Sequence, residues 1–136
     1  MSFTVGEELA SRTFAITRDS LVKYAGASGD FNPIHYRDDV AAEVGLPGVL
    51  AHGMLTMGLA ASVLDEVRTS PTQLLDYGVR FAKPVVVPAS GSVSVTVTAK
   101  VGAVDDAGVA RIDLAVVCDD VTVLTKAQAR VAPAAE

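Results

Sequence analysis

The sequence predicts an α+β fold in which a curved antiparallel sheet wraps around one long buried helix. The second half of the chain alternates apolar and polar residues with a period of two, in segments joined by short turns. The first half carries an apolar run, from Met54 to Leu64, that is too short to cross a bilayer and must therefore be buried in protein. At 136 residues, 50% of them hydrophobic, the chain is predicted to form one domain, residues 1–136, with one core.

Charge and composition exclude several classes of partner. The formal net charge is −5, and no basic cluster interrupts the acidic balance, so neither nucleic acid nor an anionic membrane is an expected partner. Cys118 is the single cysteine, so the chain cannot form an internal disulfide framework. The N-terminus lacks the basic start and apolar run of a secretory signal. We therefore expect a cytoplasmic protein.

The first half of the chain is predicted to contain helices and loops. A short helix begins after Thr17, an N-cap residue followed by polar first-turn residues, and ends at Gly26 and Gly29. A polar loop follows over residues 28–35, where the Asn-Pro pair favours extended or turning backbone. Another short helix is predicted over Asp38–Val44.

The next predicted helix runs from Gly53 to about Val67. Its apolar residues point all round the helical wheel and leave no polar stripe until Asp65 and Glu66. Such a helix has to be covered on nearly every side, and the strands that follow supply the cover.

The second half is predicted to form an antiparallel sheet with one apolar face. Turns at Asp105–Gly108 and Asp119–Asp120 join three successive strands, which make a meander. The predicted strands are Leu75–Phe81, Val93–Val101, Ile112–Cys118 and Val121–Val131. A curved antiparallel sheet wrapped around one buried helix is the hot-dog arrangement.

Two motifs carry a resemblance to a known family. The segment YAGASGDFNPIH (residues 24–35) is followed by AHGML (residues 51–55), and later by YGVRF (77–81) and PVVVP (84–88). This combination resembles the MaoC-like (R)-specific hydratase/dehydratase family, and within it the dehydratase subunits of actinobacterial type II fatty-acid synthesis. The resemblance implies a hydro-lyase that reversibly dehydrates (3R)-hydroxyacyl thioesters to trans-2-enoyl thioesters in fatty-acid metabolism.

The residues themselves suit that chemistry. Elimination of water needs a base for the C2 proton, an acid for the leaving hydroxyl and a donor for the thioester oxygen. Asp30 and His35 can converge on one substrate across the Asn-Pro turn, and the N–H of Gly53 lies free at a helix start. The resemblance implies that Asp30 and His35 are the catalytic pair, with His35 at C2 and Asp30 at the hydroxyl. Because coupled groups can exchange formal roles, that division of labour stays open.

Further residues are candidates for binding. Asn32 is expected to orient the loop or the His35 ring, Met54 and Met57 to line an acyl tunnel, and Arg80 and Lys83 to meet the phosphates of coenzyme A or phosphopantetheine. The two methionines have a plainer interpretation as core residues, and the two basic residues as solvated ones. Taken alone, Asp30 is more often a turn residue and His35 a structural histidine.

Three further expectations concern the helix and possible cofactors. His52 is expected to cap the helix or pack locally. Some family members carry a helical hydroxyl that meets the aspartate, where this chain has Ala61 and then Ser62. Two histidines at positions 35 and 52 with one distant cysteine do not predict a metal site, and no cofactor is expected beyond the substrate's own carrier.

Two other functions and two assemblies stay open. A hot-dog thioesterase is disfavoured by the intact Asp-x-Asn-Pro-x-His loop, and a non-catalytic acyl-binding partner subunit by the presence of both Asp30 and His35. The expected ligand is an acyl-coenzyme A or acyl-carrier-protein thioester. One sheet cannot cover an all-apolar helix and also close a tunnel, so we expect a homodimer or a heterodimer with a related hot-dog subunit.

Overall fold

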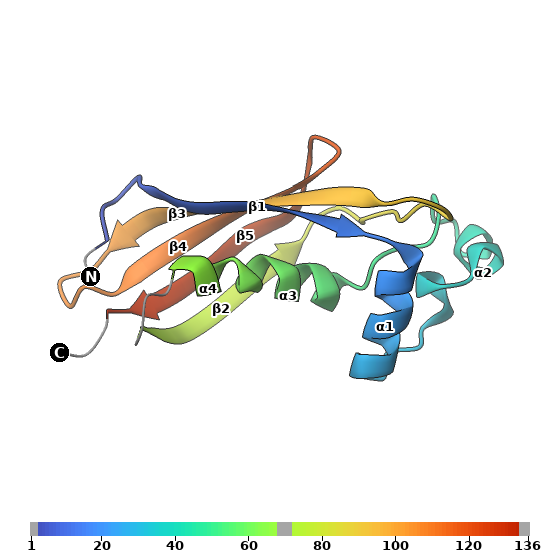
Figure 1. Cartoon of the computed structure of the whole chain (residues 1–136), viewed down its shortest axis with the longest axis horizontal. Coiled ribbons are helices and arrows are strands. Elements are labelled where there is room, and N and C mark those ends of the chain that lie inside the picture. Colours follow the sequence, from blue (N-terminus) through green and yellow to red (C-terminus); the bar gives the residue numbers. More distant parts are fainter. Residues whose placement is uncertain (1–2, 68–71, 134–136) are drawn as a thin grey trace.

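The computed structural model describes residues 3–67 and 72–133 and shows one antiparallel sheet with helices on one face and at one end (Figure 1). The helical elements include the 3-10 turn η1. In chain order the elements are β1 (Glu8–Ile16), α1 (Arg18–Ser28), η1 (Pro33–His35), α2 (Asp38–Glu43), α3 (Gly53–Ser62), α4 (Leu64–Val67), β2 (Gln73–Phe81), β3 (Val93–Val104), β4 (Ala110–Cys118) and β5 (Val121–Ala132).

The strand order is β1-β3-β4-β5-β2, with all neighbours antiparallel. The predicted meander is confirmed as β3-β4-β5, and both of its turns have the backbone that their residues favour. Asp119 and Asp120 both have positive φ (49° and 62°), as a two-residue hairpin turn requires, and Gly108 has φ 82° in the other turn. Lys126 has φ 45° at a bulge of β5, and such bulges bend a sheet.

The expectation that the first half contains only helices and loops is wrong, because β1 pairs along its length with β3. The alternation in β1 is weak, and of its residues only Ile16 is fully buried. Hydroxyl pairs on the outer face hold the strand instead: Ser11 bonds Thr98 at 3.1 Å, and Thr13 bonds Thr96 at 2.9 Å. Cross-strand pairs of this kind stabilise an edge strand that carries little apolar surface.

The predicted long helix is divided into α3 and α4 at Val63. There the N–H of Val63 bonds the Ala60 carbonyl and the N–H of Glu66 bonds the Val63 carbonyl, three residues back rather than four. The Ser62 hydroxyl donates to the Leu59 carbonyl at 2.6 Å, a local bond that competes with the helical ladder. As predicted, Thr17 caps α1 in a capping box and Gly29 (φ 78°) ends it, but Gly26, which was also predicted to end this helix, lies inside it. Helix α2 agrees with the prediction to within one residue.

Helices α3 and α4 lie along the inner face of the sheet, between β1 and β2 (Figure 1). Alternate residues of β3 and β4 are buried beneath them, and from α3 and α4 the core takes Ala60, Leu64 and Val67. This is the hot-dog fold. Met54, on the opposite side of α3, is 59% exposed, so the sheet of this chain covers only part of the helix. Among the described residues, no helix has both the length and the apolar character to span a membrane.

The Tyr77 hydroxyl joins β2 to α3 by donating a hydrogen bond of 2.7 Å to the Met57 carbonyl. Replacing Tyr77 with phenylalanine is expected to lower the free energy of unfolding by about 1 kcal/mol, the usual net value of one hydrogen bond. Urea unfolding at pH 7 measures the difference. An unchanged midpoint would show that this bond does not support the contact between β2 and α3.

Burial raises the pKa of Tyr77 to about 12, so the folded state favours the protonated phenol. The resulting stability is fully present below the ordinary pKa of 10.0 and is lost as the pH rises through about 12. Urea unfolding of the wild type at rising pH should therefore show a loss of stability in this range that the Tyr77→Phe variant lacks.

Candidate active site

The loop from Ser28 to His35 is a chain of turns closed by side chains. The Ser28 hydroxyl accepts from the Asp30 N–H, Asp30 Oδ1 accepts from the Asn32 N–H, and Asn32 Oδ1 accepts from the Ile34 N–H. Each bond spans two residues, the typical pattern of Asx and Ser turns. These bonds use one carboxylate oxygen of Asp30 and leave Oδ2 free.

His35 is buried at the end of this loop, and its hydrogen bonds determine which ring nitrogen can act. Nδ1 lies 2.7 Å from the Leu50 carbonyl oxygen, which can only accept, so Nδ1 carries the proton. The neutral ring therefore has its lone pair on Nε2, and that atom lies 4.0 Å from Asp30 Oδ2. One hydroxyl or water oxygen can reach both atoms at hydrogen-bond distance.

Gly53 is the first residue of α3, where the N–H groups have no partner within the helix. It also lies against the ring of Phe81. A Cβ atom at this position would be 2.8 Å from Phe81 Cε1, closer than side chains approach in proteins. Any side chain here would therefore force the Phe81 ring or the start of α3 to move.

His52 precedes Gly53 and is 1% exposed. Its ring stacks on the ring of His35, with centroids 3.8 Å apart and planes inclined by 19°. Nε2 lies 3.1 Å from the Asp30 carbonyl oxygen and donates to it. Burial lowers the pKa of His52 below its ordinary value. The hydrogen bond to the Asp30 carbonyl opposes this effect but is weaker than it.

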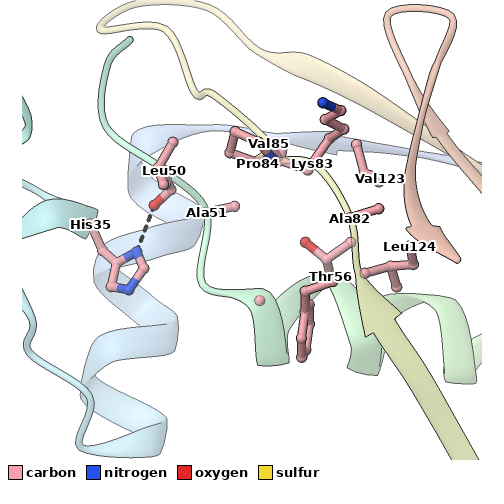
Figure 2. A pocket seen from close by; sticks show the side chains of 12 residues that line it. His35, Leu50, Ala51, Thr56, Ala82, Lys83, Pro84, Val85, Val123 and Leu124 are labelled. Atoms are coloured by element: carbon pink, nitrogen blue, oxygen red, sulfur yellow. Dashed lines mark hydrogen bonds between the residues drawn. The ribbon is translucent and has the colours of Figure 1, made fainter. Parts of the chain in front are cut away.

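A pocket of about 340 Å³ lies beside His35, between the start of α3 and the segment after β2 (Figure 2). Most of its lining is apolar. Thr56 is the exception within α3: it is buried, and its hydroxyl points into the pocket (Figure 2). The pocket is lined by His35, Leu50, Ala51, Gly53, Thr56, Phe81, Ala82, Lys83, Pro84, Val85, Val123 and Leu124.

Comparison with known proteins decides the family. The model of the MaoC-like domain matches residues 2–116. The chain belongs to the MaoC-like domain family. The hot-dog fold agrees with solved structures: an (R)-hydratase from Pseudomonas aeruginosa in the unliganded form superposes with a TM-score of 0.84 at 26% identity, over 98% of this chain and 84% of the other.

Two curated relatives are similar in sequence to part of this MaoC-like domain. A 3-hydroxyacyl-thioester dehydratase X from Mycobacterium tuberculosis is 42% identical over 80 residues, which are 59% of this chain and 28% of that protein. An (R)-specific enoyl-CoA hydratase from Rhodospirillum rubrum is 31% identical over 90 residues, which are 65% of this chain and 62% of that protein. The matches thus span less than two thirds of either relative.

The predicted site residues of the MaoC-like domain fall into two groups. His35, Gly53 and Lys83 line the pocket, with the ammonium group of Lys83 directed away from His35 (Figure 2). Asp30 Oδ2 lies 4.0 Å from His35 Nε2, but Asp30 is not itself part of the lining. Asn32 caps η1 through its side chain. The others lie outside the pocket lining: Met54 is exposed, Met57 is half-buried with its carbonyl bonded to Tyr77, and Arg80 is exposed in β2 opposite Thr125.

Sequence reasoning did not identify Thr56 as a pocket residue. The available signal was that Thr56, three residues after Gly53, is one of only two hydroxyl residues in the apolar run from Met54 to Leu64. Only the packing of α3 on the sheet shows that this face meets the pocket. The Ser62 hydroxyl is not available to Asp30, because it donates to the Leu59 carbonyl.

The separation of the two histidines in sequence does not keep them apart. The fold brings one potential ligand atom each from Asp30, His35 and His52 within 4.8 Å of one another. A metal ion must lie near the plane of each imidazole that binds it, at about 2.0–2.1 Å. The stacked rings have nearly parallel planes 3.8 Å apart at their centroids, and those planes do not meet at such a distance. This geometry disfavours an ion shared by both histidines.

Proposed function

We propose that this MaoC-like domain catalyses the reversible dehydration of (3R)-hydroxyacyl thioesters to trans-2-enoyl thioesters. One observation carries the proposal: Asp30 Oδ2 and His35 Nε2 lie 4.0 Å apart, beside a largely apolar pocket and the start of α3. The names of the two curated relatives, a hydroxyacyl-thioester dehydratase and an enoyl-CoA hydratase, support the same reaction class.

The elimination needs only groups that this chain and its substrate supply. His35 Nε2 takes the C2 proton of the hydroxyacyl thioester, and negative charge develops on the thioester oxygen. The N–H of Gly53, at the positive end of the α3 dipole, stabilises that charge. Protonated Asp30 gives its proton to the C3 hydroxyl, which leaves as water. The C2 proton then passes from His35 Nε2 to Asp30 Oδ2 through a water that bridges them. This transfer restores neutral His35 and protonated Asp30 for the next turnover.

The pocket indicates where the substrate lies. Its apolar walls, formed by residues such as Leu50, Val85 and Leu124, suit the acyl chain, and Thr56 offers one hydroxyl beside it. Lys83 extends from the pocket wall, where it can meet a phosphate of coenzyme A or of a phosphopantetheine arm (Figure 2). Either carrier satisfies this geometry.

A second hot-dog subunit is the proposed partner. Strand β2 is an edge strand, with β5 on one side and an open row of backbone groups on the other. Apolar side chains on β2 and α3, including Leu75 and Met54, are exposed in the single chain. The Asp30 carboxylate is also half-exposed in the single chain, so a neighbouring subunit could enclose the catalytic pair.

The purified chain is expected to sediment as a dimer at micromolar concentration. Replacing Leu75, which is 43% exposed, with lysine should shift the equilibrium toward monomer, because a charge on this face would have to be desolvated. Analytical ultracentrifugation over a concentration series measures both. A monomeric wild type that is fully active would contradict the proposal, whereas an inactive monomer that a related subunit activates would identify the partner as heterologous.

A single assay tests the reaction itself. The purified protein is incubated with crotonyl-coenzyme A while enoyl absorbance and free thiol are followed together. Hydration removes the absorbance without releasing thiol, and chiral analysis should give the (3R) alcohol. Release of thiol would indicate a thioesterase instead. No change in either signal, in the dimer or with a partner subunit present, would indicate an acyl-binding protein.

A further inference from the structure

His52 contacts both residues of the proposed catalytic pair but takes part in none of the proposed chemical steps. The His35 ring covers one face of its imidazole, and Tyr24 meets it edge-on with centroids 4.7 Å apart. Packing alone does not account for a histidine here, because Nδ1 is buried without a hydrogen-bond partner among the described residues. An apolar ring of similar size would fill the space and bury no unpaired nitrogen.

We propose that His52 is a positioning residue that holds the acid–base pair in fixed register with the N–H of Gly53. The inference rests on the proposed function, since it assigns His52 a part in the same reaction. His52 makes three links, each to a different part of the site.

The first link is to the loop. Nε2–H of His52 donates to the main-chain carbonyl of Asp30 at 3.1 Å, so it fixes the backbone of that residue and leaves Oδ2 of the side chain free. The second link is the stack on His35. Together with the bond from His35 Nδ1 to the Leu50 carbonyl, this stack holds the His35 ring in the plane that directs Nε2 toward Asp30.

The third link is covalent. His52 is the residue before α3, and its carbonyl accepts the N–H groups of Leu55 and Thr56 at 3.0 and 3.2 Å. The main chain of His52 is therefore bonded to the helix that begins at Gly53, while its side chain is bonded to the loop that holds Asp30. Movement of either element strains the bond to the other. Misplacement of reacting groups by about 1 Å can cost 10²-fold in rate, so such a link has a catalytic consequence.

The same contacts determine the charge of His52. The Asp30 carbonyl requires a proton on Nε2, and Nδ1 has no acceptor that would stabilise a second proton. Three titratable groups surround the ring: His35 stacks on it, the main chain of Asp30 accepts from its Nε2–H, and Tyr24 meets it at an interplanar angle of 61°. A neutral His52 allows His35 to take up a proton during turnover without a second positive charge stacked against it.

Two variants separate the links. His52→Phe keeps a ring for the stack and removes the N–H donor, whereas His52→Gln keeps an N–H donor of similar reach and removes the ring. With crotonyl-coenzyme A, His52→Phe is expected to lower kcat about 10²-fold while KM stays within about threefold. His52→Gln should recover about tenfold of that loss. Leu21→Val, a conservative change at a buried residue of α1, serves as a stability control and should keep kcat.

A spectroscopic measurement tests the placement independently of activity. In ¹⁵N NMR of the unliganded wild type, His52 should show a protonated Nε2 and an unprotonated Nδ1 from pH 6 to pH 8. Amide exchange in residues 30–35 should accelerate in His52→Phe and remain at the wild-type rate in Leu21→Val. If the wild type lacked hydratase activity, the proposed function would fail while these readouts still tested the link.

The inference is overturned by either of two results. One is a His52→Phe variant whose kcat stays within about threefold of the wild type while its melting temperature falls, which would show a role in packing alone. The other is a proton on Nδ1 of His52, because the bond to the Asp30 carbonyl would then be absent.

Discussion

Asp30→Asn is expected to abolish hydration of crotonyl-coenzyme A, with a fall in kcat of about 10²–10⁴-fold, the usual contribution of one general acid or base. The fold should be unaffected, because an asparagine oxygen can still accept the N–H of Asn32 that Asp30 Oδ1 accepts now. Asp39→Asn is the matched control: it makes the same chemical change at an exposed residue that is paired with Arg37, and it should leave kcat unchanged.

His35 requires two variants because its ring has a structural contact as well as a chemical one. His35→Ala removes the base and also the donor to the Leu50 carbonyl, whereas His35→Asn keeps an N–H close to the position of Nδ1. Both should be as inactive as Asp30→Asn, and only the alanine variant should lose stability. Enoyl absorbance and thermal unfolding measure the two effects. Activity near that of the wild type in His35→Asn would remove His35 from the mechanism.

The double variant distinguishes a pair from two separate groups. If Asp30 and His35 share one water and exchange a proton, removal of the second should cost much less than removal of the first, since groups that act as a unit are not additive. Independent groups would multiply their losses. The 4.0 Å separation of Oδ2 and Nε2 predicts the first result.

Much of this site could be predicted from sequence because its key contacts are local. Asp30 and His35 are joined by one Asn-Pro turn, and each bond that shapes the turn spans two residues. The same holds for the Thr17 cap and for the turns of the meander, where short-range residue preferences determine the backbone.

What could not be predicted depends on how distant elements pack. Strand β1 is held by hydroxyl pairs with β3 and not by its own alternation, so its sequence alone gave no strong signal. The stack of His52 on His35 joins residues 17 positions apart, and the entry of Thr56 into the pocket depends on the rotation of α3 against the sheet. A helix that is apolar all round does not indicate which face meets a pocket.

Substitution of Gly53 tests the third group of the mechanism, and two variants separate shape from hydrogen bonding. Gly53→Ala keeps the N–H but places a Cβ 2.8 Å from Phe81 Cε1, so the ring or the start of α3 must move. We expect a fall in kcat of about 10²-fold from that misplacement. Gly26→Ala is the control, because Gly26 lies within α1 with no atom within 4 Å of the added Cβ. It should keep activity and gain up to about 1 kcal/mol of stability.

Gly53→Pro has a Cβ as well but lacks the N–H that would receive the oxyanion. The backbone suits it, because proline is tolerated at the first position of a helix and His52 before it has φ −58° and ψ 130°, which a residue before proline favours. Relative to Gly53→Ala, the proline variant should lose a further factor of about 10²–10³ in kcat, the typical value of one oxyanion donor. Equal rates in the two variants would show that the enolate oxygen is stabilised elsewhere, and the start of α3 would then serve only to shape the pocket.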